Sequence, residues 1–152
     1  MDLLNDLTVE NRPALKRKRW IASFIDHFIY LLIYIVVIYS FGIGTTEYDG
    51  TRRWVLSGPA MLLPLAMWIV MFPFMEAFNY GQTIGKVFLN LKVIKEDGSN
   101  ASFGYCLIRH LLDIVDYLPI LGIIGLVVAS NNSKKQRVGD LVAKTMVVEA
   151  LK

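Results

Sequence analysis

Long runs of hydrophobic residues dominate the first half of the chain. Trp20–Phe41 is 22 residues long, and its only Asp, Glu, Lys, Arg or His side chains are Asp26 and His27. The 22 residues Trp54–Met75 contain none of these side chains. About 20 mostly apolar residues are enough to cross a ~30 Å hydrocarbon core. Each run therefore predicts a full transmembrane helix. The first run is longer than a signal-peptide core and is interrupted by charge, so we expect it to be retained.

A third apolar region, Phe103–Ser130, has a mixed pattern. Its first half carries charges, and its second half, Tyr117–Ser130, is uncharged but only 14 residues long. A helix of that length covers ~21 Å, too little to cross a membrane alone. The pattern favours a broken or re-entrant helical region.

Two short segments alternate in a different way. Leu91–Lys95 places apolar and basic residues at every second position, which indicates a half-exposed strand. Thr145–Val148 is a similar run near the end of the chain. We expect the two segments to pair as a short β-ribbon on the membrane surface.

The chain has 16 basic and 13 acidic residues, a net charge of +3, and their distribution predicts its topology. Five basic residues lie in 12–19, three in 86–95 and five in 134–152. The positive-inside rule places these three segments in the cytoplasm and residues 42–53 outside. Three full crossings would put the tail outside, so the charges favour an even number. Basic residues that flank apolar spans need no nucleic acid, and we expect no nucleic-acid partner.

Together these patterns predict an all-α integral membrane protein. It has two full transmembrane helices, a third broken or re-entrant helical region and a short cytoplasmic β-ribbon. Residues 1–19 form a cytoplasmic N-terminal segment, 20–149 a single membrane domain and 150–152 a tail. Two or three helices can hardly enclose a pathway alone, so we expect a homo-oligomer.

Charged residues inside apolar segments are the candidate site. Asp26 falls about two turns into the first span and needs a cationic partner there, and Arg19 lies on the same helix face. Arg109, Asp113 and Asp116 form one stripe at i, i+4 and i+7. One interpretation is a buried ion-pair network that fixes helix packing. The other is a cation or proton path through the three aspartates, with Arg19 and Arg109 as counter-charges.

Two further charged residues are candidates for a cytoplasmic gate or lock. Asp140 follows the basic run Lys134–Arg137 and precedes the last strand. It could cap a short helix, or pair with Lys86 or Arg19 at the cytoplasmic face.

Enzyme motifs are missing from the sequence. Gly81–Lys86 has a Gly-Lys that no Ser or Thr follows, unlike a phosphate-binding loop. The lone Cys106 and two histidines offer no thiolate or multi-histidine metal cluster. We expect no catalytic residue, no cofactor and no metal.

Several spaced motifs resemble the RDD membrane-protein family, which is named for one arginine and two aspartates. The run Arg19–Asp26 is similar to the family's R-x-x-A-x-x-I-D opening, and Gly81–Lys86 to its G-Q-T-x-G-K segment. Leu91–Ile94 with Asp97-Gly98 resembles the L-x-V…D-G segment that follows, and Arg109 matches a later arginine. Gln136–Leu141, followed by Thr145, resembles its closing Q-R-x-G-D-x…T element.

The resemblance makes Arg19 the arginine and Asp26 the first aspartate. Asp140 is the choice for the second aspartate, with Asp116 as the rival. The resemblance also implies a bacterial plasma-membrane protein of a family suspected of transport, with sodium/proton exchange attributed to some members.

Two functions follow as hypotheses. The first is transport of a small monovalent cation in exchange for protons, through a multi-pass protein with a cytoplasmic N-terminus. The second is an accessory or regulatory protein that does not transport, whose buried charges are structural and whose partner is another membrane protein. The lipid bilayer is a partner in both.

Overall fold

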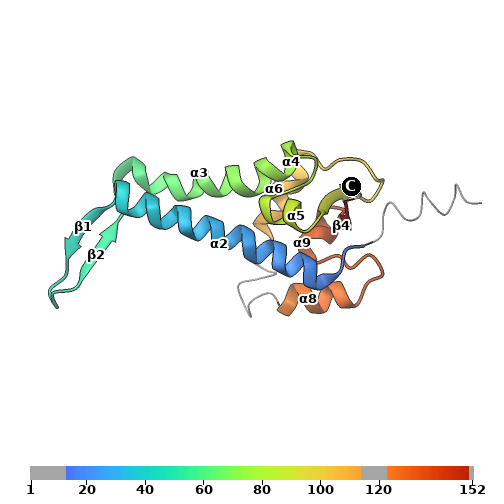
Figure 1. Ribbon diagram of the computed structural model, residues 1–152, viewed down its shortest axis with the longest axis horizontal. Coiled ribbons are helices and arrows are strands. Elements are labelled where there is room, and N and C mark those ends of the chain that lie inside the picture. The colour runs from blue at the N-terminus through green and yellow to red at the C-terminus, as the bar shows by residue number, and fades with distance from the viewer. Residues whose placement is uncertain (1–12, 114–122, 151–152) are drawn as a thin grey trace, which may run out of the picture.

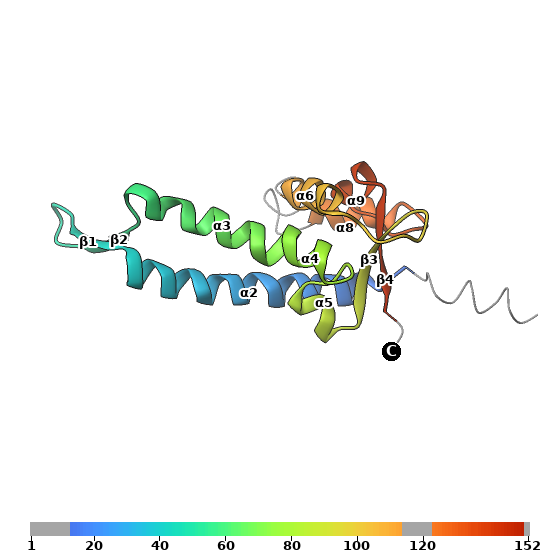
Figure 2. The same cartoon turned by 90° about the horizontal axis from the view of Figure 1, so that it is seen from above.

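A computed structural model describes residues 13–113 and 123–150 of the 152-residue chain. Two long helical rods run side by side in opposite directions (Figure 1). A β-hairpin extends beyond one end of the rods, and short helices with a two-stranded sheet gather at the other end (Figure 2). We call the two rods the helix pair, and the elements that follow residue 78 the head.

The two predicted apolar helices are confirmed. The first, α2 (Lys16–Phe41), has 26 residues and is ~39 Å long. The second rod joins η1 (Gly58–Leu62), α3 (Leu63–Ile69), η2 (Val70–Phe74) and α4 (Met75–Phe78), 21 residues and ~32 Å in all. Both are long and apolar enough to cross a membrane. Only 11% and 17% of their most apolar windows are buried within the chain.

The expected start of the second span at Trp54 is wrong. Residues 43–55 form a hairpin instead of a polar loop, with β1 (Ile43–Thr46) antiparallel to β2 (Arg52–Val55). A turn closes it, in which Gly50 has φ +82° and Asp49 accepts the backbone N–H of Thr51 at 2.9 Å. The helix begins only where Gly58, at φ +57°, redirects the chain.

The second rod contains a π-helical turn at η2. Pro73 lies inside that turn and has no N–H to donate, which interrupts the regular helix. Single π turns inside α-helices are often found at functional sites. This turn directly precedes α4, which carries the fully buried Glu76.

The β-ribbon of the head is confirmed. The strand β3 (Leu91–Lys95) pairs antiparallel with β4 (Thr145–Glu149), and Val93 lies opposite Val147. The ribbon is less exposed than the alternation predicts, because β4 is buried from Thr145 to Val148. It packs in a small apolar core with the start of α2 and the first part of α6 (Phe103–Leu111).

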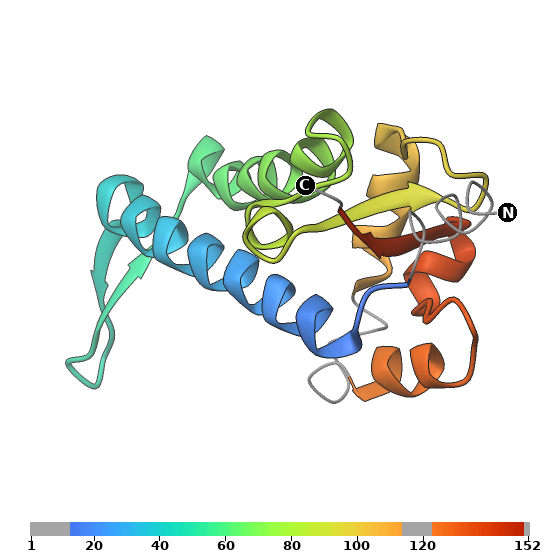
Figure 3. The ribbon, with the colours of Figure 1, turned by 45° about the vertical axis from the view of Figure 1, so that its right-hand side comes forward.

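Within the third apolar region the structure describes α6, which ends at Leu111, and α8 (Ile123–Ser130), whose eight residues span ~12 Å. Residues 114–122 lie outside the described part, so the broken or re-entrant form of this region stays a prediction. The side chain of Lys16, in the first turn of α2, donates to the Ser130 hydroxyl at 2.6 Å. That contact holds α8 beside the start of α2 (Figure 3).

The start of α2 and both strands of the ribbon lie at the same end of the helix pair, opposite the hairpin (Figure 1). This agrees with an even number of crossings. The side of the membrane on which the head lies stays a prediction, as does the re-entry of the third region.

Candidate functional site

Charged side chains fill the junction between the helix pair and the head. Four carboxylates and four fixed cations meet there, together with one histidine, and six of the nine are buried while the other three are partly buried. The members of this buried charge cluster are Arg19, Asp26, Glu76, Lys86, Arg109, His110, Asp113, Arg137 and Asp140.

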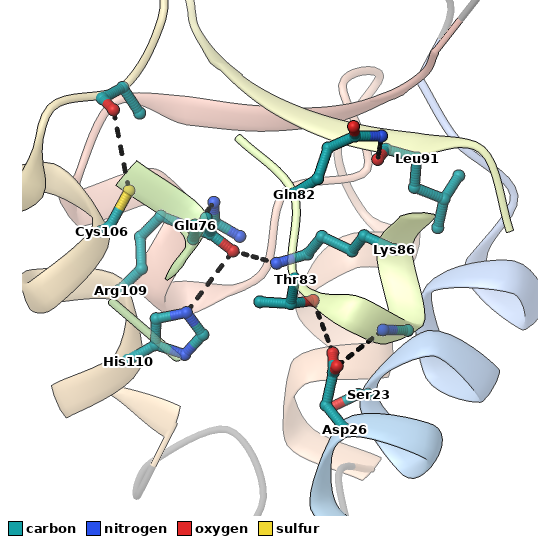
Figure 4. Close-up of polar contacts among 12 residues, drawn as sticks. Ser23, Asp26, Glu76, Gln82, Thr83, Lys86, Leu91, Cys106, Arg109 and His110 are labelled. Atoms are coloured by element: carbon teal, nitrogen blue, oxygen red, sulfur yellow. Dashed lines mark hydrogen bonds and ion pairs between the residues drawn. The ribbon is translucent and has the colours of Figure 1, made fainter. Parts of the chain in front are cut away.

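Glu76 lies at the centre of the cluster and is completely buried. One of its oxygens, Oε1, accepts Nη1 of Arg109 at 2.8 Å. The other, Oε2, receives Lys86 Nζ and lies 3.4 Å from His110 Nε2 (Figure 4). Glu76 is not among the residues that the sequence pattern predicts for the site. The sequence feature that could have identified it is an acid directly after a 22-residue apolar run, with no basic residue one helical turn away to pair with it.

Asp140 joins the head to α2. It lies in α9 (Val138–Val142), where its side chain caps the helix by accepting the N–H of Arg137 at 3.2 Å. It also forms ion pairs with Arg19 and, at 2.9 Å, with Arg109. Burial alone would raise the pKa of Asp140, but Arg109, Arg19 and Arg137 together hold it below its ordinary value. Two expectations for Asp140, the helix cap and the Arg19 pair, are confirmed.

Asp26 has a different role from the one expected. Its two oxygens accept the Thr83 hydroxyl at 2.6 Å and the Gly85 N–H at 2.7 Å, at the start of α5 (Ile84–Phe88) (Figure 4). A carboxylate there is stabilised by the free N–H groups and the dipole of the helix. Within the described part of the chain no ion pair includes Asp26, so the expected pairing with a cation is wrong. Lys86 pairs with Glu76, not with Asp140.

His110 lies between two carboxylates. Its Nδ1 is 2.8 Å from Asp113 Oδ2, and its Nε2 faces Glu76. A neutral imidazole donates through one nitrogen only, so this geometry favours the doubly protonated ring. Burial alone would lower the pKa of His110, but Glu76 and Asp113 raise it above its ordinary value.

Asp113 completes the cluster on the side of α6. Arg137 Nη2 binds its other oxygen at 2.9 Å. Burial alone would raise the pKa of Asp113, but Arg137 and His110 lower it overall. Asp116, the third acid of the predicted stripe, lies outside the described residues.

A cavity of about 40 Å³ lies within the cluster. It has room for about three water molecules. The charged residues that line it, within the described ranges, are Arg19, Asp26, Lys86, Arg109, His110, Asp113 and Arg137. Glu76 and Asp140 do not line it, but they bind basic side chains that do.

The cluster offers no metal site or nucleophile in the described ranges. No group of three His, Cys, Asp or Glu side chains is arranged to hold a metal ion there. Burial raises the pKa of the nearby Cys106 thiol to about 12, so the reactive thiolate does not form near neutral pH. What the arrangement can do is bind the head to the helix pair and hold one proton on His110.

The residues that carry the sequence motifs converge in this cluster. Arg19 contacts Asp140, Asp26 holds the start of the Gly81–Lys86 segment, and Arg109 bridges Glu76 and Asp140. The sequence profile of the RDD family matches residues 13–144. The chain belongs to the RDD family. Asp140 contacts Arg19 directly, and its place as the second aspartate of the name, with Asp116 as the rival, stays a prediction.

A curated relative of this RDD protein is the uncharacterized protein YxaI of Bacillus subtilis (strain 168). The two are 27% identical over 150 residues, which cover 90% of this chain and 97% of YxaI. No solved structure matches the chain.

Proposed function

We propose that this RDD protein is an accessory or regulatory membrane protein that neither transports nor catalyses, and whose buried charge cluster binds the head to the helix pair. The observation that carries the proposal is that each described carboxylate of the cluster is compensated within the chain. Glu76, Asp113 and Asp140 each bind at least two basic side chains, and Asp26 binds the start of a helix.

An exchange site needs a carboxylate that can release its partner and take a cation or a proton in turn. Separating a buried ion pair costs about 3–5 kcal/mol when one partner is left without compensation. Asp140 has three arginines as partners, and Glu76 has Arg109, Lys86 and His110. A cation that competed for these oxygens would have to displace several fixed charges at once.

The large apolar surface of the helix pair supports a location in the plasma membrane. With so little of that surface buried within the chain, lipid or other transmembrane helices must cover it. The partner of an accessory role is thus another membrane protein or a second copy of this chain. The proposal includes two crossings and a cytoplasmic N-terminus, on the basic residues at that end.

Exchange of a small cation for protons is the second candidate. It is favoured by the cavity, which Asp26, Asp113 and the protonatable His110 all line. In that case Asp113 is the acid that releases its partners, because it has fewer of them than Glu76.

Proteoliposomes that contain the purified full-length chain and a pH-sensitive dye separate the two candidates. We expect no sodium-driven proton flux, and the same trace from Asp113→Asn and from Arg53→Gln, a change in the exposed hairpin. A known exchanger in matched vesicles shows that the dye responds. Flux in the wild type and in Arg53→Gln, lost in a folded Asp113→Asn, would overturn the accessory function.

A further inference from the structure

We propose that the cavity in the buried charge cluster binds a small monovalent anion of halide size. This goes beyond the accessory role and does not depend on it. The inference rests on the sign of the charge around the cavity, on a buried donor left without an acceptor, and on the size of the space.

The described lining of the cavity is strongly basic. Five basic side chains face two acids, and the acids that balance the rest, Glu76 and Asp140, lie outside the lining. Asp26 and Asp113 line the cavity, but both oxygens of each are engaged by other groups of the chain. The basic lining residues are Arg19, Lys86, Arg109, Arg137 and, when protonated, His110; the second histidine, His27, also lines the space. With His110 protonated the cluster has one positive charge in excess, and most of its positive side chains line the space, which favours an anion over a cation there.

One buried donor nitrogen of a lining residue lacks an acceptor. Arg109 Nε has no hydrogen-bond partner in the part of the chain that the structure describes. His110 Nε2 has only the long, 3.4 Å ion pair with Glu76. A buried donor without an acceptor destabilises the fold. An anion in the cavity supplies an acceptor and neutralises the excess charge at once.

The size of the space decides the class of anion. At about 40 Å³ it holds about three water molecules, so a halide fits and leaves room for water. An organic anion such as gluconate is larger than this space. The size of the space thus points to chloride or bromide.

Protonation of His110 raises the affinity of the cavity for a halide. With His110 protonated, the cluster has five positive and four negative side chains, and with it neutral the charges balance. Halide binding is therefore tighter at low pH. The charged and titratable groups around His110, taken over every element packed there, are Glu76, Lys86, Arg109, Asp113, Arg137, Arg19, Asp26 and His27.

The test is thermal unfolding of the purified full-length chain in detergent, with sodium gluconate replaced stepwise by sodium chloride or bromide. Sodium and ionic strength stay constant, so a cation site cannot produce the response. A ligand that binds only the folded chain raises the melting temperature in proportion to RT ln(1 + [L]/Kd). We expect a rise that fits this single-site form at pH 6.0, and an apparent Kd at least several-fold weaker at pH 8.5. No halide dependence of the wild type at pH 6.0 would overturn the proposal.

A variant whose larger side chain fills part of the cavity tests the location of the halide site without removing any charge. Ser23 lines the cavity from α2, so Ser23→Met occupies part of the space, and we expect it to lose the halide response. Ser40→Met makes the same change at an exposed position of the same helix and should keep it. Should Ser23→Met fail to fold, the smaller Ser23→Val takes its place. A folded cavity variant that responds like the wild type would overturn the proposed location.

Discussion

Single residues at the junction show why the cluster is stable where each of its charges alone would be costly. Glu76 is buried at the end of an apolar helix, yet Arg109, Lys86 and His110 compensate its charge. A lone carboxylate in that place would be protonated or would destabilise the fold. The stability of the junction is therefore a property of the set of charges, and it depends on the protonation of its single histidine.

His110 makes stability depend on pH. Its folded pKa lies above the unfolded value of about 6.5. The contribution of the ion pairs is thus complete below pH 6.5 and is lost as pH rises through the folded pKa. We expect the free energy of unfolding, measured in gluconate from pH 6 to 9, to fall over this range. His110→Gln should remove that fall, and His27→Gln, which changes the chain's other histidine, should keep it. If the free energy of unfolding fell equally with pH in the wild type and in His110→Gln, His110 would not be the cause of the fall.

At the scale of elements, the sequence predicts more of the fold than of the site. Apolar runs and alternation are local patterns, and they give both long helices and the ribbon strands. The hairpin was missed because Trp54 and Val55 continue the apolar run, although Gly58 and Pro59 start the helix later. The partners of Asp26 were missed because they lie 57 and 59 residues away, and no helical periodicity connects such positions.

The contact between α5 and α2 depends on Gly85. A Cβ at this position would overlap the carbonyl oxygen of Ala22 on α2, so α5 would have to move away and lose its bond to Asp26. We expect Gly85→Ala to lower the free energy of unfolding by about 1–3 kcal/mol, the usual cost of overpacking. Chemical or thermal unfolding in detergent measures the change.

Gly104→Ala is the matched control. Gly104 lies in α6, and a Cβ there meets no atom of the described chain within 4 Å. The added methyl group should leave stability unchanged or raise it by up to about 1 kcal/mol, because alanine favours the helix. If the two variants lose similar stability, the close contact at Gly85 is not what holds α5 on α2.

For the whole molecule, charge counting along the sequence and the arrangement in space agree. The basic N-terminal part of α2 and both ribbon strands lie at one end, and the hairpin at the other (Figure 1). The distribution of basic residues could predict this arrangement because crossings alternate sides. It could not predict which acid meets which base, since that depends on how α4, α6 and α9 approach α2.

Cysteine labelling in intact cells tests the orientation. In a Cys106→Ala background, a cysteine at Tyr48, the exposed hairpin tip, should react with an impermeant reagent added outside. Cysteines at Lys92 and Lys144 should react only after the cells are opened. Labelling of position 144 from outside in intact cells would show that the tail is external and that the two-crossing topology is wrong.

The central claim is that the cluster's charges are compensated within the chain as the structure places them, and two double-mutant cycles on the same arginine test it most directly. Arg19 pairs with Asp140 on the head, whereas Asp26, about 10 Å along the same helix, binds Thr83 and Gly85. We predict that Arg19→Gln and Asp140→Asn are coupled in the free energy of unfolding by about 0.5–3 kcal/mol, the range for contacting residues. Arg19→Gln and Asp26→Asn should add to within about 0.5 kcal/mol. Coupling of Arg19 to Asp26 with none to Asp140 would contradict the claim.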